Sequence, residues 1–209
     1  YGMNDGGYAA CTPKTVENYR VALEGIVAGL KKKGVRQIIL GTPGAVDTDS
    51  FKKLDPSVYN NTLSELGKAA KEVAEKESLG FADIHTVMLD AMTKAKAKYG
   101  KRYFVAGNDG IHPNCNGHLV MAYVFLKAMG FGGDIGTITL DMESGKAEAS
   151  GGHKVLGAGQ DFVEIESSRY PFCFTGKPQQ PDANIGMTEF IPFNEDLNRF
   201  KLIVKNAPG

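Results

Sequence analysis

Asp109 and His112 lie in the stretch NDGIHPNCNGH (Asn108–His118) and have the spacing D-x-x-H. Three residues of turn can bring an aspartate carboxylate to one nitrogen of the imidazole, which fixes the tautomer of the ring. The second nitrogen then stays free to take a proton from a hydroxyl nucleophile. The pair therefore indicates acid–base chemistry, although the spacing alone is also typical of a histidine that simply precedes a helix.

The same stretch has a second interpretation as a metal site. His112, Cys115 and His118 recur at every third position, with Asp109 three residues before them. Imidazole and thiolate ligands at short spacing are typical of zinc sites. Against this, Pro113 stiffens the link and a helix is expected to begin near position 116. Cys115 and His118 are therefore also explained by packing at the start of a helix.

A second polar loop opens the chain, YGMNDGG (Tyr1–Gly7), in which Asn4 and Asp5 stand among glycines before a helical segment. In a parallel α/β sheet such a loop would follow the carboxyl end of a strand, where sites are built. The Asn4 amide could there donate a hydrogen bond to a developing oxyanion. The alternative interpretation is a glycine-rich turn with an Asx motif.

Composition bounds the class of protein. The chain has 209 residues, of which 42% are apolar and 23% charged, as expected of one medium domain or one domain and part of another. Lys+Arg and Asp+Glu both number 24, so neither nucleic acid nor an anionic membrane surface is expected as a partner. The longest apolar run, Leu119–Met129, is too short to span a bilayer. The cysteines, Cys11, Cys115 and Cys173, suggest neither a disulfide framework nor a CxxC metal knuckle.

The first part of the chain alternates helical and strand patterns, which predicts βα units around a parallel sheet. The last of its helices is apolar nearly all round and is expected to be well buried. Helices are expected over 12–33, from about residue 55 with apolar positions up to Val73, over 87–98 and over 117–129. The expected strands are Val35–Leu40 and Gly80–Ile84.

After residue 130 the pattern changes to short alternating strands. Candidates are the stretches 138–149, Asp161–Ser168 and Arg199–Asn206, interrupted by a Pro- and Gly-rich segment from Pro171 to Phe193. The sequence thus predicts two domains. Residues 1–130 form an α/β domain, and residues 131–209 form an antiparallel β-rich accessory module that is expected to be incomplete.

Two motifs together resemble a known family. Gly2-Met3-Asn4-Asp5 and Asp109-Gly110-Ile111-His112-Pro113, roughly a hundred residues apart, resemble the G-x-N-D and D-x-x-H-P motifs of the SGNH hydrolases, also called the GDSL esterases and lipases. LGTPGAVD (Leu40–Asp47) resembles the loop after the fourth strand of that family. The resemblance covers residues 1 to about 130 and implies a flavodoxin-like three-layer α/β/α fold, here incomplete.

The resemblance also implies a role for each matched residue. Asn4 would donate to the oxyanion, His112 would act as general base and then acid, and Asp109 would orient His112, while Asp5 would hold its loop. The implied substrate is a small-molecule or carbohydrate ester, with carbohydrate O-acetyl esters as the first choice. The resemblance implies no cofactor and no metal, and it points to a secreted or periplasmic location.

One departure from the family pattern changes the expectation. In the family the nucleophilic serine of a G-D-S motif precedes the asparagine motif. Here only three residues precede Asn4, so the given sequence has no room for a G-D-S motif before it. Thr48-Asp49-Ser50 follows the wrong strand and lacks the glycine, so we reject Ser50 as the nucleophile. The chain is therefore expected to be the C-terminal part of a serine esterase domain, inactive by itself, with its nucleophile outside these residues.

The alternative class is a non-catalytic module that binds a glycan or a protein on an SGNH-like scaffold. The aromatic residues Tyr170, Phe172 and Phe174 could form a carbohydrate platform, but packing in a core strand explains them more simply.

Overall fold

The computed structural model describes residues 1–208 and divides them into two compact units. The first unit comprises Tyr1–Phe131 and Thr175–Ile191, and the second comprises Gly132–Phe174 and the described residues from Pro192 onward. Residues 175–191 therefore pack within the first unit. The division into a domain of residues 1–130 and a module of residues 131–209 stays a prediction. Among the described residues, no helix is both long and apolar enough to cross a membrane.

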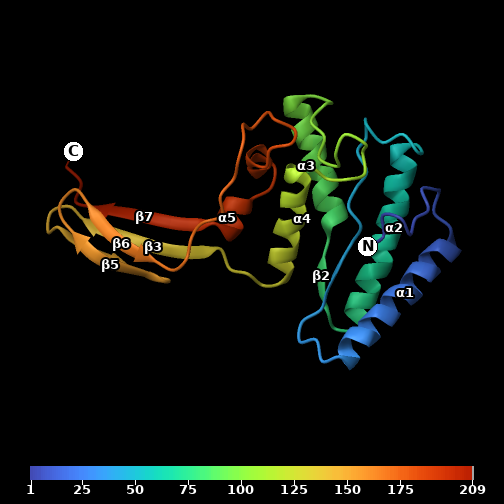
Figure 1. Ribbon diagram of the computed structural model, residues 1–209, viewed down its shortest axis with the longest axis horizontal. Helices are drawn as coiled ribbons and strands as arrows, with labels where there is room; N and C mark the ends of the chain where they lie inside the picture. The colour runs from blue at the N-terminus through green and yellow to red at the C-terminus, as the bar shows by residue number, and fades with distance from the viewer. Residues whose placement is uncertain (209) are drawn as a thin grey trace. The chain divides into compact units, whose positions relative to one another are not determined.

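The first unit is a mixed α/β structure in which helices flank a short parallel pair of strands (Figure 1). Its elements in chain order are α1 (Pro13–Lys32), β1 (Ile39–Gly41), α2 (Pro56–Lys76), β2 (Gly80–Ala82), α3 (Ile84–Tyr99), α4 (Cys115–Ala128) and the 3₁₀ helix η1 (Ile185–Glu189). The predicted alternation of helix and parallel strand is confirmed, but both strands are shorter than predicted. The two strands pair along their whole length, since Ile39 lies opposite Gly80 and Gly41 lies opposite Ala82.

Local capping explains where the long helices begin. The Thr12 hydroxyl accepts a hydrogen bond from the Thr15 backbone N–H at 3.1 Å, and Pro13 occupies the first turn of α1. The Asp55 carboxylate caps α2 in the same way, accepting from the Ser57 N–H at 2.8 Å. Both helix starts are thus fixed by short-range signals in the sequence.

Helices cover both faces of the β1–β2 pair. On one face Leu40 packs with α1 and α2 in a core that includes Leu23 and Leu66. On the other face α4 approaches so closely that a Cβ at Gly41 would lie 2.7 Å from the Phe125 ring. Glycine at position 41 therefore lets α4 pack directly on the strand.

The expectation that α4 is well buried is wrong for most of the helix. Only Asn116, Gly117, Val120 and Val124 are buried in it. Its Met121 and Phe125 side chains line a pocket instead of packing into a closed core. Apolar composition predicted burial, but it does not show which side of the helix has a packed neighbour.

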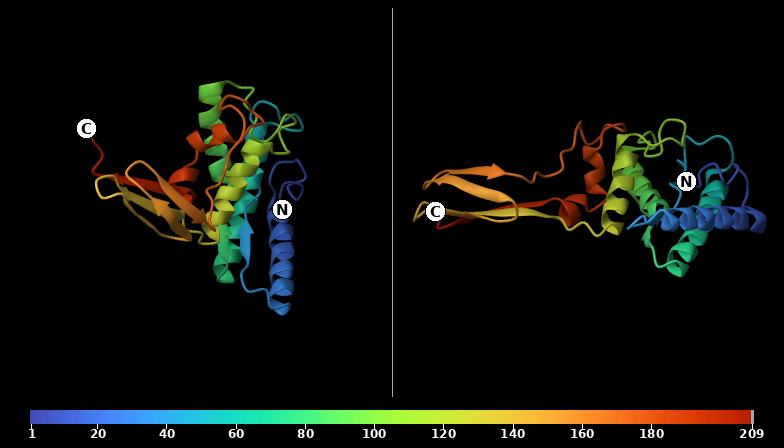
Figure 2. Two further views of the ribbon diagram at one scale, coloured as in Figure 1. Left: turned by 60° about the vertical axis from the view of Figure 1, so that its left-hand side comes forward. Right: turned by 60° about the horizontal axis from the view of Figure 1, so that its bottom comes forward.

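The second unit consists of short strands and one helical turn (Figure 2). Its elements are β3 (Asp134–Asp141), β4 (Lys146–Ala149), β5 (His153–Ala158), β6 (Val163–Ser167), α5 (Phe193–Leu197) and β7 (Arg199–Lys205). The predicted antiparallel pairing is correct for β3–β4 and β5–β6 but wrong for β3–β7, which pair in parallel. Parallel pairing needs a long connection, and the chain between the end of β3 and the start of β7 provides it.

The aromatic residues of the tail do not form one exposed group. The rings of Phe172 and Phe174 meet the buried Phe193 ring edge-on, at centroid distances of 5.3 and 5.4 Å. Tyr170 is 73% exposed. Two of the three residues therefore pack against the interior of the second unit, which favours the packing interpretation.

Candidate active site

The Asp109–His112 pair is formed in the loop between α3 and α4. Asp109 Oδ2 lies 2.6 Å from His112 Nδ1, while Asp109 Oδ1 accepts the backbone N–H groups of Ile111 at 2.9 Å and His112 at 3.0 Å. The His112 side chain is 82% exposed. One carboxylate thus fixes both the ring and the backbone of His112, and the Nε2 atom of the ring remains open to a substrate.

Two glycines allow this loop to close. Gly107 has φ +79° and Gly110 has φ +78°, a region that L side chains rarely adopt. A Cβ at Gly107 would lie 1.9 Å from the carbonyl oxygen of His112, and one at Gly110 would lie 2.4 Å from the backbone nitrogen of Phe51. The close approach of these backbones therefore requires glycine at both positions.

The surroundings of Asp109 keep its carboxylate ionised. Burial works to raise the pKa of Asp109, but hydrogen bonds from the His112 ring and from the backbone N–H groups of His112 and Ile111 outweigh it and lower the pKa to about 2. An ionised carboxylate on Nδ1 stabilises the imidazolium that forms when His112 takes a proton. The electrostatics of the pair therefore suit a general base.

Asn4 lies in a loop that several contacts hold in place. Its Oδ1 atom accepts the hydroxyl of Tyr8 at 2.7 Å, while Asp5 Oδ2 accepts the backbone N–H of Gly2 at 3.0 Å and the Tyr59 hydroxyl donates to the Met3 carbonyl. With Oδ1 occupied, the amide directs its Nδ2 donors elsewhere, and no partner for them is found among residues 1–208. Asp5 holds the loop, as expected.

Asn4 and His112 line the same pocket, which has a volume of about 580 Å³. His118 and Pro113 lie along it as well. The structure therefore brings the three predicted site residues into one region, with Asp109 behind His112. Their catalytic roles stay a prediction.

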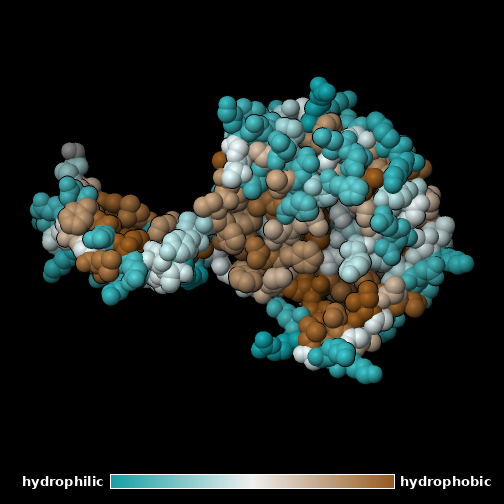
Figure 3. Space-filling model, viewed as in Figure 1, coloured by the Kyte–Doolittle hydropathy of each residue, from teal (hydrophilic) through white to brown (hydrophobic). Residues whose placement is uncertain are grey.

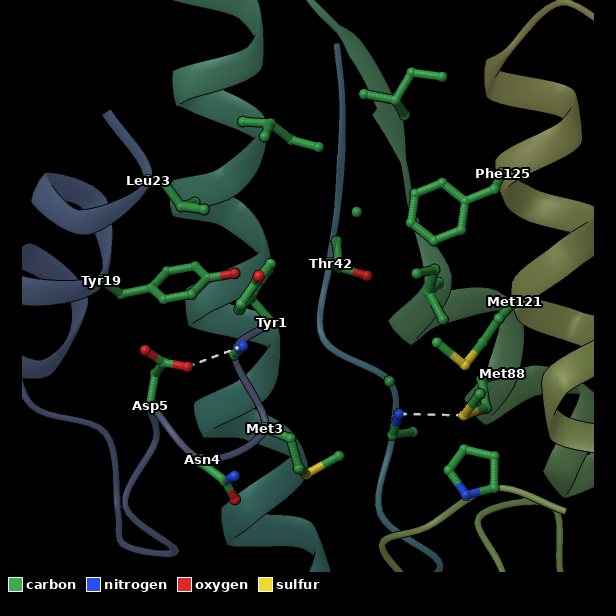
Figure 4. A pocket seen from close by; sticks show the side chains of 18 of the residues that line it. Tyr1, Met3, Asn4, Asp5, Tyr19, Leu23, Thr42, Met88, Met121 and Phe125 are labelled. Carbon is green, nitrogen blue, oxygen red and sulfur yellow. Dashed lines mark hydrogen bonds between the residues drawn. The ribbon is translucent and has the colours of Figure 1, made fainter. Parts of the chain in front are cut away.

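The rest of the pocket is an apolar trench. Tyr19 and Leu23 of α1 form one side, Met121 and Phe125 of α4 form the other, and the chain of β1 runs between them (Figure 4). Figure 3 shows apolar side chains gathered on the surface of the first unit between α4 and α1. His112 thus lies beside an apolar surface.

The Tyr19 hydroxyl is buried and has no hydrogen-bond partner in the described part of the chain. Burial raises the pKa of Tyr19 to about 12, and the Asp5 carboxylate adds to the effect. The Tyr19 hydroxyl therefore stays protonated at neutral pH and lines the trench as a hydrogen-bond donor without an acceptor among the described residues.

The described structure adds no support for the zinc site that the spacing of His112, Cys115 and His118 suggested. Within residues 1–208, no group of three or more His, Cys, Asp or Glu side chains is placed to hold a metal ion. Cys115 and His118 are exposed on the first turns of α4. Both lie at the start of a helix as expected, but Cys115 is exposed, so the expected packing of its side chain is wrong.

Some residues around the site carry no motif in the sequence. Tyr8 orients Asn4, and the Ser50 hydroxyl donates to the carbonyl of Gly107 at 3.1 Å. Ser50 thus contacts the backbone of the loop that carries Asp109 and His112. The Ser50–Gly107 contact could not be read from spacing, because these residues are far apart in the chain, whereas Tyr8 lies only four residues after Asn4.

Comparison with known proteins places the fold. No protein-family model and no curated protein sequence matches the chain. Among solved structures, BT4096, a gut microbial diltiazem-metabolizing enzyme, is similar over 98% of this chain and 50% of its own, with a TM-score of 0.70 and 23% identity. The chain therefore shares its fold with BT4096 and spans about half the length of that protein.

Two further structures match in part. A catalytic mutant of Axe2, an acetylxylan esterase from Geobacillus stearothermophilus, is 26% identical over 62% of this chain and 57% of its own, with a TM-score of 0.45. A predicted GDSL-like lipase from Parabacteroides merdae is 26% identical over 55% of this chain and 50% of its own, with a TM-score of 0.43.

The ionisation of Asp109 can be followed by carbon-13 NMR of its carboxyl group. We expect a midpoint of about 2 in the folded protein, below the ordinary value of about 3.9. Because the pKa of the folded state is the lower one, ionised Asp109 stabilises the fold above about pH 4, and this contribution disappears as the pH falls toward 2. In His112→Ala the midpoint should rise but stay below 3.9, since the Ile111 N–H still donates. His118→Ala is the control and should leave it unchanged; an ordinary midpoint in the wild type would contradict the geometry.

Gly107→Ala should open the loop. Positive φ at an alanine costs about 1–2 kcal/mol, and the clash with the His112 carbonyl adds to it, so we expect a loss of more than about 2 kcal/mol in the free energy of unfolding. Gly130→Ala is a matched control, since Gly130 also has φ +79° but a Cβ there meets nothing within 4 Å. Equal losses in the two variants, measured by chemical denaturation, would show that the close approach at Gly107 is absent.

Proposed function

We propose that the first unit carries the acid–base and oxyanion half of an SGNH/GDSL-type serine esterase. The observation that carries the proposal is the Asp109–His112 hydrogen bond at 2.6 Å beside a pocket that Asn4 also lines. The motifs Gly2–Asp5 and Asp109–Pro113 add the resemblance to that family. In this proposal the fold is an incomplete flavodoxin-like α/β/α arrangement, and the nucleophilic serine lies outside these 209 residues.

The proposed mechanism assigns one step to each residue. His112 Nε2 takes the proton of the serine hydroxyl as it attacks the ester carbonyl, and later returns a proton to the leaving alcohol. Asp109 stabilises the imidazolium between these steps. The Asn4 Nδ2 group donates to the oxyanion of the tetrahedral intermediate. Water then hydrolyses the acyl-enzyme by the same route, with His112 again as the base.

The open edge of β1 supports an additional strand beside it. In a parallel ladder, alternate residues direct their N–H and C=O groups to one neighbour. Gly80 donates to Ile38 and Thr42 donates to Ala82, so Ile39 and Gly41 direct theirs away from β2. Within the described residues no strand pairs on that side. An extended apolar segment from outside these residues would pair there, fill the trench and offer a backbone carbonyl to Tyr19.

The proposed substrates are acyl esters, and carbohydrate O-acetyl esters are the first to test. His112 is 82% exposed, so a bulky alcohol such as a sugar can approach its Nε2 atom without displacing the loop. The β-rich second unit would accompany the catalytic unit as an accessory module.

The test is to produce the protein together with its upstream coding sequence and to assay hydrolysis of p-nitrophenyl acetate and acetylated xylan. The 209-residue chain alone should show no turnover above background. In the longer protein, His112→Ala should lower kcat about 10⁴-fold or more and Asn4→Ala about 10²–10³-fold.

Asp90→Asn is the matched control for Asp109→Asn, because Asp90 is an exposed carboxylate paired with Lys94 on α3. It should leave the rates unchanged, whereas Asp109→Asn should lower kcat strongly. Full activity in His112→Ala would overturn the proposal. An inactive longer protein that binds glycan would favour the binding-module alternative, and zinc lost in both His112→Ala and His118→Ala would favour the metal site.

A further inference from the structure

A charged cluster lies under the catalytic loop, away from the trench. Lys96 of α3 places its Nζ atom 2.7 Å from Asp47 Oδ1 and 2.7 Å from Asp49 Oδ2, and it donates to the Lys101 carbonyl at 3.2 Å. The Lys96 side chain is 9% exposed and that of Asp47 is fully buried. A buried ion pair of this kind loses much of its Coulomb energy to desolvation, so its effect on structure is mainly to fix geometry.

Asp47 uses this charge to hold the turn that follows it. Its Oδ1 atom also accepts the backbone N–H groups of Asp49 and Ser50, each at 2.9 Å. Its Oδ2 atom is buried and has no partner among residues 1–208. The printed contacts of the Asp47 side chain are therefore all made by Oδ1, and without Lys96 the buried carboxylate would lose the one cation that pairs with it among residues 1–208.

The turn held by Asp47 contacts the catalytic loop on both sides of Asp109. The Asp47 backbone N–H donates to the Gly110 carbonyl at 3.0 Å, and the Ser50 hydroxyl donates to the Gly107 carbonyl at 3.1 Å. Gly107 and Gly110 are also hydrogen-bonded to each other, from the Gly110 N–H to the Gly107 carbonyl at 3.0 Å. The turn thus clamps the two ends of the short segment that carries Asp109.

We propose that Ser50 and Lys96 are positioning residues that hold the Asp109–His112 pair in its hydrogen-bonded geometry. Ser50 acts directly on the loop, and Lys96 acts through Asp47. The catalytic meaning of this role rests on the proposed function, but the geometric role does not. Ser50, which sequence order excludes as the nucleophile, therefore has a different use beside the same site.

The test measures the Asp109 carboxyl midpoint by carbon-13 NMR in Ser50→Ala and Lys96→Met. Loosening the clamp weakens the hydrogen bonds that Asp109 accepts, so the midpoint should rise by about half a unit or more in both. Ser50→Thr keeps a hydroxyl at the position and should restore the wild-type value. Lys94→Met is the matched control, since Lys94 lies on the same helix but its partner is the exposed Asp90; it should leave the midpoint unchanged.

The roles of Ser50 and Lys96 are tested by separate outcomes. A wild-type midpoint in a folded Ser50→Ala overturns the role of Ser50, and one in a folded Lys96→Met overturns the role of Lys96. If circular dichroism shows that Lys96→Met does not fold, Lys96→Arg replaces it, and a wild-type midpoint in Lys96→Arg together with a raised one in Ser50→Ala supports the clamp. In the longer protein Ser50→Ala should lower kcat and leave KM unchanged. Because the NMR midpoint needs no turnover, an inactive protein would count against the proposed function alone.

Discussion

The carboxylate of Asp109 is the constraint on which the arrangement of the site depends. It accepts three hydrogen bonds, two of them from backbone N–H groups and one from the His112 ring. A single side chain therefore sets the turn of the loop and the tautomer of the histidine together. The glycines at 107 and 110 follow from this requirement, because the loop can close around Asp109 only where backbones approach closely.

A short loop at the surface does not hold such a geometry by itself, and the surrounding unit supplies the support. The turn after β1 hydrogen-bonds to the loop from below, and that turn is fixed by Lys96 on one side and by Asn60 on the other. The Asn60 side chain accepts from the Val46 N–H at 2.9 Å and donates to the Val46 carbonyl at 3.0 Å, as a neighbouring strand would. Helices α2 and α3 thus position the loop through polar contacts as well as through packing.

What could be predicted from the sequence is what short-range chemistry determines. The Asp109–His112 contact, the caps at Thr12 and Asp55 and the alternation of helix and strand all arise from residues a few positions apart. The placement of Asn4 beside the same pocket followed from the family resemblance, since no local rule joins residues so far apart. Lys96 and Ser50 act across the chain, and nothing in their spacing could reveal them. Tyr8 lies only four residues from Asn4, but no motif marks it.

The errors have the same origin. Apolar composition predicted a buried α4, but burial depends on what lies opposite each face, and Met121 and Phe125 face the trench. Alternating residues predicted strands in the second unit correctly, while the parallel pairing of β3 with β7 depends on a connection that periodicity does not describe.

In the proposed function, His112 and Asn4 serve one reacting centre. A crystal structure of the longer protein after reaction with a phosphonate ester tests it directly, because the phosphonyl group marks the nucleophile and mimics the tetrahedral intermediate. We expect an adduct whose oxygen lies about 3 Å from Asn4 Nδ2, with His112 Nε2 within hydrogen-bond distance of the serine or leaving-group oxygen. An adduct that contacts neither residue would contradict it.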